Sequence, residues 1–168
     1  MDDLPHLLDR LRAERRADPG AAHCWQDHLQ RLAHDLRRVA LARPEAFATL
    51  ATAPAAAPGL RPPLGDVDWV EEVLVVLVDG GFDDAAAVAA YRAFVTCVLG
   101  HLLLEASLHA GGPDSPAFPG VPGDPAARGG RPVLDRLGSS LAEDHDADEF
   151  DDALEAVLAR MEALRAEH

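Results

Sequence analysis

The stretch over residues 69–110 constrains the fold more than any other part of this chain. It begins with the pattern of an amphipathic helix that stops at the pair Gly80 and Gly81. A long helix, capped by Asp83, is predicted next over residues 84–109, and it is apolar almost all the way round. A helix that is buried on two sides needs two partners. We therefore expect one side to face the chain's own core and the other to face a second subunit.

Apolar residues recur at helical spacing elsewhere too, and no segment has a convincing strand pattern. A first helix is expected over residues 4–11. A second should begin at Trp25 and end at Arg43, because the following Pro44 disfavours helical geometry there. A short helix should follow, and Asp68 has the position of a cap on the helix before Gly80. The predicted fold class is all-α, with about seven helices.

The last predicted helix carries apolar residues at alternating spacings of four and three, which is a heptad-like seam. One interpretation is an ordinary core face. We favour the other, a dimer that closes through a four-helix bundle built from two helices of each subunit. The expected interface residues are Val98, Leu102, Phe150, Leu154, Val157, Met161 and Leu164.

The length of 168 residues suits a single domain with one core. Residues 51–63 are rich in alanine and proline, so a connecting loop is expected there. The segment over residues 111–131 is rich in proline and glycine and is the predicted mobile loop.

The formal net charge is −14, which opposes contact with the phosphates of nucleic acid. The two cysteines, Cys24 and Cys97, form no disulfide framework, and the N-terminus lacks the apolar run of a signal peptide. We expect a soluble, cytoplasmic protein that contacts no membrane and carries no cofactor.

The chain resembles the C-terminal, ligand-sensing half of TetR-family transcriptional regulators, specifically the Tet repressor class. The resemblance rests on weak motifs that occur in the right order over nearly the whole chain. They are Asp2-Asp3-Leu4, Leu7-Leu8, Trp25-Gln26-Asp27-His28-Leu29, Thr52-Ala53-Pro54, Gly81-Phe82, Val98-Leu99-Gly100, Pro132-Val133-Leu134, Glu149-Phe150 and Ala153-Leu154-Glu155. It implies a dimerisation domain with an effector cavity inside each subunit, closed by a helix of the partner.

In that family the drug and its magnesium are held by an Asn, a His and a Glu. The matching positions look like Leu32, Leu50 and Leu104, or His28 and Glu105 if the register shifts by one residue. Leucine offers no oxygen ligand, so a magnesium site is not expected. The expected ligand is instead a small hydrophobic or aromatic effector.

The predicted cavity is enclosed by apolar side chains, with Arg92 or His101 as a polar anchor. The candidate ligand-binding residues are Trp25, His28, Leu32, Leu36, Phe47, Leu50, Val88, Tyr91, Arg92, Val95, His101 and Leu104. The alternative is a filled core, because several of these residues have ordinary core spacing.

The resemblance also implies that the helix-turn-helix domain of the family is absent from this chain and would precede it. Operator DNA would then be bound only through that domain. One hypothesis is therefore the effector-sensing domain of a regulator, most simply a repressor that its ligand releases from DNA. The other is a headless dimer that acts by pairing with other proteins.

Enzymatic and metal sites are weaker interpretations. His101, Glu105 and His109 are spaced four apart and could in principle chelate a metal, but such groups are more often ordinary contacts. The acidic run over residues 143–149 lacks the glycine of a calcium loop and abuts a helix start, so a role at the helix N-terminus is favoured. We expect no catalysis and no bound metal.

Overall fold

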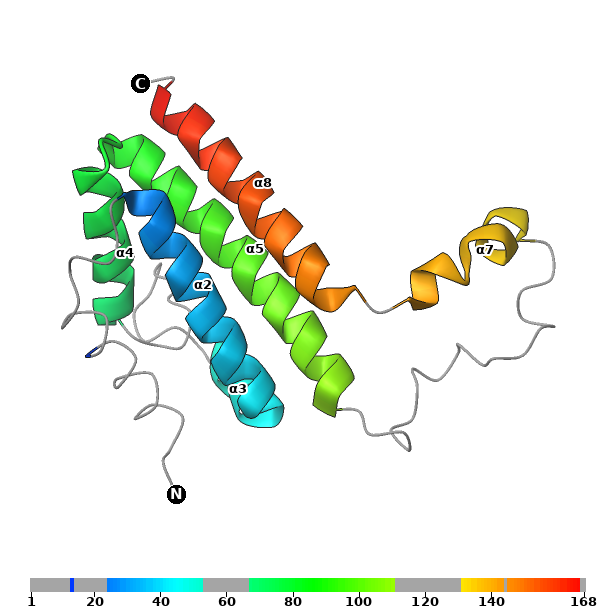
Figure 1. Ribbon diagram of the computed structural model, residues 1–168. Helices are drawn as coiled ribbons and strands as arrows, with labels where there is room; N and C mark the ends of the chain where they lie inside the picture. The colour runs from blue at the N-terminus through cyan, green and yellow to red at the C-terminus, as the bar shows by residue number, and fades with distance from the viewer. Residues whose placement is uncertain (1–12, 14–23, 53–66, 111–130, 144, 167–168) are drawn as a thin grey trace.

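The computed structural model describes residues 13, 24–52, 67–110, 131–143 and 145–166. All regular structure among these residues is helical, which confirms the predicted fold class (Figure 1). The elements are α2 (Trp25–Ala42), α3 (Pro44–Ala51), α4 (Val67–Asp79), α5 (Asp84–Ala110), α7 (Pro132–Leu137), the short 3₁₀ helix η2 (Ser140–Ala142) and α8 (Asp146–Ala166). The predicted helix over residues 4–11 and nearly all of the two predicted loops lie outside the described residues.

Helix α2 forms because one of its faces is apolar over its full length. Its buried residues include Trp25, Leu29, Leu32, Leu36 and Val39, the set expected from the spacing of four and three. The helix ends at Ala42, with Arg43 as its C-cap, and Pro44 is the first residue of α3. Proline is favoured at that position because its missing N–H would have no partner inside the helix.

The turn between α4 and α5 depends on two glycines for different reasons. A Cβ atom on Gly80 would come within 2.8 Å of Cδ1 of Trp25, and Gly81 has a φ of 91°, which side chains rarely allow. Asp83 then caps α5, because its Oδ1 accepts a hydrogen bond of 2.8 Å from the N–H of Ala86. The predicted turn and cap are confirmed. Asp68, however, lies inside the first turn of α4 rather than in front of it.

Helix α5 is the central element of the bundle. It contacts α2, α3, α4 and α8 (Figure 1). By length and composition alone, residues 84–109 could cross a membrane. A helix in the core of a protein has the same length and composition. Four neighbouring helices pack against α5.

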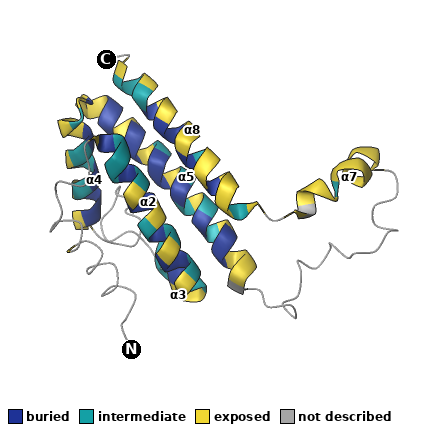
Figure 2. Cartoon of the chain, in the orientation of Figure 1, coloured by how far each residue is buried: buried dark blue, intermediate teal, exposed yellow. Residues whose placement is uncertain are grey.

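The predicted dimer seam packs inside the chain. Six of its residues are no more than 8% exposed, because α8 lies along α5 of the same chain and their apolar faces meet (Figure 2). They are Val98, Leu102, Phe150, Leu154, Val157 and Met161. The seventh residue, Leu164, is half-buried against the same core. Heptad spacing identifies a packing face but does not specify which chain covers it, so the dimer interface at these residues stays a prediction.

Helix α7 differs from the other helices in having no buried residue. In Figure 1 it stands apart from the four long helices, and in Figure 2 it is exposed along its length. Val133, Leu134 and Leu137 of α7 and Leu141 of η2 are large apolar side chains exposed by 39–72%.

Candidate functional site

Six of the predicted ligand-binding side chains lie in one apolar cluster. Trp25, Leu32 and Leu36 come from α2, Phe47 from α3, and Tyr91 and Val95 from α5, and none is more than 8% exposed. The two leucines share a face because they are four residues apart on a helix. This cluster is the part of the predicted site that the fold brings together. A cavity wall and a filled core would both place these residues here.

Three other predicted residues lie on the surface of the chain. Val88 is 41% exposed, Leu104 is 63% exposed, and Arg92 is also exposed. They lie on a side of α5 that no described element of the chain covers, so they do not line a cavity within it. The ligand-binding role of these three residues stays a prediction, since the sequence could not show which sides of an all-round apolar helix are covered.

His101 and Leu50 occupy intermediate positions. Leu50 is half-buried and packs against the core cluster from the last turn of α3. The ring of His101 contacts the ring of Phe150 on α8, with centroids 5.4 Å apart. His101 therefore contacts α8, and its role as a polar anchor stays a prediction.

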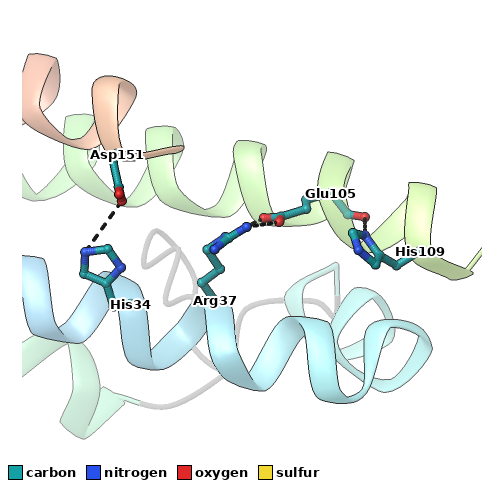
Figure 3. Close-up of polar contacts among 5 residues, drawn as sticks. All are labelled: His34, Arg37, Glu105, His109 and Asp151. Carbon is teal, nitrogen blue, oxygen red and sulfur yellow. Dashed lines mark hydrogen bonds and ion pairs between the residues drawn. The ribbon is translucent and has the colours of Figure 1, made fainter. Parts of the chain in front are cut away.

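A pair of hydrogen bonds joins Arg37 of α2 to the buried Glu105 of α5 (Figure 3). Glu105 is 2% exposed, and its two carboxylate oxygens accept hydrogen bonds from Nε of Arg37, at 3.0 Å, and from Nη2. The hydrogen bond to Glu105 raises the pKa of Arg37, so the guanidinium stays charged. This two-pronged pair fixes the register between α2 and α5. No local pattern in the sequence marks Arg37 as this partner, although a buried carboxylate requires one.

Phe150 lies where α2, α5 and α8 meet, and cationic or titratable groups surround its ring. The guanidinium carbon of Arg37 is 5.5 Å from the ring centroid, and the ring of His34 is 5.7 Å away. His34 in turn points toward Asp151 of α8, with 3.7 Å between Nε2 and Oδ1 (Figure 3). These contacts stabilise the packing of α8 against α2.

A second polar group lies between α2 and α4. Nε2 of His28 is 3.6 Å from Oε1 of Glu72, and the two side chains are 20% and 15% exposed. Trp25, one turn earlier on α2, makes an edge contact with Phe82 at a centroid distance of 5.0 Å. Nε1 of Trp25 and Nε2 of His28 are buried without a hydrogen-bond partner among the described residues.

Two hollows open on the surface. One, of about 540 Å³, lies between α2 and α8 and is lined mainly by polar side chains that include Asp27, Arg31 and His34. The other, of about 390 Å³, lies beside α7, and its lining from Pro132 to Leu141 is almost entirely apolar. Apart from Leu154, which is in the first hollow, neither contains a predicted site residue.

Reactive groups do not gather at any described position. Within the described ranges, no three His, Cys, Asp or Glu side chains are arranged to hold a metal ion. Glu105 is bonded to Arg37, and Nδ1 of His109 lies 2.9 Å from the backbone oxygen of Glu105. Burial raises the pKa of Cys97, which disfavours its thiolate.

The helical order and the central α5 agree with a comparison against known families. Residues 18–165 match the family described as the tetracyclin repressor-like, C-terminal domain. The chain belongs to this family. No curated protein and no solved structure matches the chain. A tetracyclin repressor-like C-terminal domain is a regulatory module that dimerises and binds small molecules.

At the three described positions that match the tetracycline–magnesium site, this tetracyclin repressor-like domain has leucine. Of the three matching positions, Leu32 is buried, Leu50 is half-buried and Leu104 is exposed, and none supplies an oxygen ligand. The buried carboxylate nearest in sequence is Glu105, but both of its oxygens already bind Arg37. The residues present therefore do not fit the magnesium complex.

Proposed function

We propose that this chain is the effector-sensing and dimerisation domain of a TetR-family transcriptional regulator. In the simplest form of the proposal it serves a repressor that a small hydrophobic or aromatic ligand releases from operator DNA. The observation that carries the proposal is the match to the tetracyclin repressor-like C-terminal domain over residues 18–165. The protein would act in the cytoplasm. Contact with DNA would belong to a helix-turn-helix domain outside this sequence, since an acidic chain is repelled by phosphates.

The proposed dimer interface is the outer face of α5 together with the adjacent face of α8. On α5 this face includes Ala89, Thr96 and Gly100, all exposed, and the residues from 93 to 104 carry no Asp, Glu, Lys or Arg. A Cβ atom on Gly100 would meet nothing within 4 Å. On α8 the exposed Ala156 and Ala163 have the same small size. Small residues allow two helices to approach closely, so two copies could form a bundle of four helices.

The proposed effector cavity is bounded by the apolar cluster of α2, α3 and α5. Its lining is apolar, which suits a hydrophobic ligand. The exposed Val88 and Leu104 would contribute to a site only where a second copy covers them, so they belong to the proposed interface.

The test is the oligomeric state of the full chain, measured by light scattering at micromolar concentration. We expect a dimer for the wild type and a monomer for Gly100→Glu, because two like charges would meet across the interface. The matched control Thr49→Glu adds the same charge to the exposed side of α3 and should stay dimeric. Replacing glycine inside a helix raises helix propensity, so Gly100→Glu should keep its helical circular dichroism. A folded monomer for the wild type would refute the proposed function.

A further inference from the structure

Two buried side-chain nitrogen atoms on one side of α2 lack hydrogen-bond partners among the described residues. They are Nε1 of Trp25 and Nε2 of His28, which lies one turn later on the helix. Trp25 is 5% exposed. A buried donor that loses its water without gaining a partner destabilises the folded state. Proteins keep few such groups, and those that remain are often functional.

The position of His28 relates it to the proposed cavity. Leu32 and Leu36 follow it at intervals of four residues, so all three side chains lie along the same face of α2. Glu72 lies opposite, on α4, next to the fully buried Val73. The imidazole is therefore at one end of the apolar wall that α2 contributes, with a carboxylate facing it.

The spacing of this pair fits one kind of polar group. The distance of 3.6 Å between Nε2 of His28 and Oε1 of Glu72 is too long for a hydrogen bond. A ligand that enters between α2 and α4 at this point would bridge the two atoms with one oxygen. A hydroxyl group at this point would accept a hydrogen bond from Nε2–H and donate one to the carboxylate, which is an acceptor only. A methyl group would form neither of these two hydrogen bonds.

We propose that the effector is a hydroxylated aromatic compound whose hydroxyl group binds between His28 and Glu72. This inference rests on the proposed effector-sensing function and specifies the ligand class. The aromatic ring would extend along α2 toward Leu32 and Leu36, where the lining is apolar. Nε1 of Trp25 is a further donor on the same side, available to a second oxygen. A plain hydrocarbon of the same shape would leave these donors unpaired and should bind less tightly.

The experiment compares two probes of nearly equal shape, 2-naphthol and 2-methylnaphthalene, by calorimetric titration of the full chain. Because only the first can bridge His28 and Glu72, we expect it to bind about tenfold more tightly. Equal affinities in the wild type would overturn the inference.

Variants of α2 assign the preference to His28. His28→Phe should bind both probes equally, while His28→Gln, which keeps an amide donor, should restore part of the preference. His34→Phe is the matched control, because this histidine is on α2 but is largely exposed, and it should keep the wild-type preference. A preference that survives in His28→Phe would overturn the assignment.

The melting temperature of the free protein separates a ligand-binding role of His28 from a purely structural one. Nε2 of His28 makes no hydrogen bond to any described residue of the free protein, so the variant His28→Gln, which keeps a polar group beside Glu72, should leave the melting temperature nearly unchanged. A clear fall would show that His28 holds the fold together, and would contradict the inference. If neither probe binds but other hydrophobic compounds raise the melting temperature, the ligand class is wrong and the proposed function stands. If no compound binds, the effector-sensing function itself fails.

Discussion

Glu105 is the residue whose environment departs furthest from that of an ordinary surface carboxylate. Its side chain is 2% exposed, and its charge is compensated by the guanidinium of Arg37. The side chain of Arg37 is 22% exposed. Removing one partner of a buried pair leaves the other charge without compensation. We expect Glu105→Ala to lower the free energy of unfolding by about 2 kcal/mol, somewhat less than for a fully enclosed pair because water reaches Arg37.

A control variant separates the effect of leaving a buried charge unpaired from the effect of losing an exposed ion pair. Glu143 also pairs with a basic group, His145, but both side chains are more than half exposed. Glu143→Ala should therefore change the free energy of unfolding by less than about 0.5 kcal/mol. Chemical denaturation of the two variants measures both quantities, and similar small losses would mean that Glu105 is not the clamp between α2 and α5.

Deprotonation of Tyr91 lowers the stability of the folded protein at alkaline pH. Burial raises the pKa of Tyr91 to about 12, from an ordinary value of 10.0. Between these values the folded state keeps a proton that the unfolded state has lost, so this contribution to stability is complete below pH 10 and is lost as the pH rises toward 12. Tyr91 is the single tyrosine in the sequence, so phenolate absorbance reports it alone. We expect a titration midpoint near 12 in the folded protein. A midpoint near 10.0 would show that the phenol is open to water.

At the scale of elements, the sequence predicted the helices themselves better than it predicted which of their faces are covered by other helices. Local chemistry determines where a helix starts and stops, so the end of α2 before Pro44 and the cap at Asp83 followed from the residues alone. A cap at Asp68 places the first helical residue at Trp69, whereas α4 begins two residues earlier, at Val67, because boundaries respond to neighbouring segments as well as to local chemistry.

The candidate site was only partly predictable for a related reason. Leu32, Leu36 and Phe47 were identified correctly as interior residues, since the apolar faces of α2 and α3 are distinct from their polar faces. On α5 nearly every face is apolar, so the pattern could not distinguish the buried Val98 from the exposed Leu104. The partner of Glu105 was also out of reach, because Arg37 lies 68 positions away and is brought near only by packing of α2 on α5.

For the whole molecule, the proposed dimer makes folding depend on concentration. The outer face of α5 combines the exposed Leu104 and Leu108 with small residues such as Gly100, and an apolar surface of this kind is stabilised when a second copy covers it. If folding and association are coupled, the folded dimer gains about 1.4 kcal/mol for each tenfold increase in protein concentration. The melting temperature should therefore rise by about 3 °C per tenfold increase. Calorimetry of the full chain over a hundredfold dilution series measures this slope; Thr49→Glu should keep it and Gly100→Glu should lose it. A melting temperature that stays constant on dilution would mean that each copy is stable alone and that association adds little to the fold.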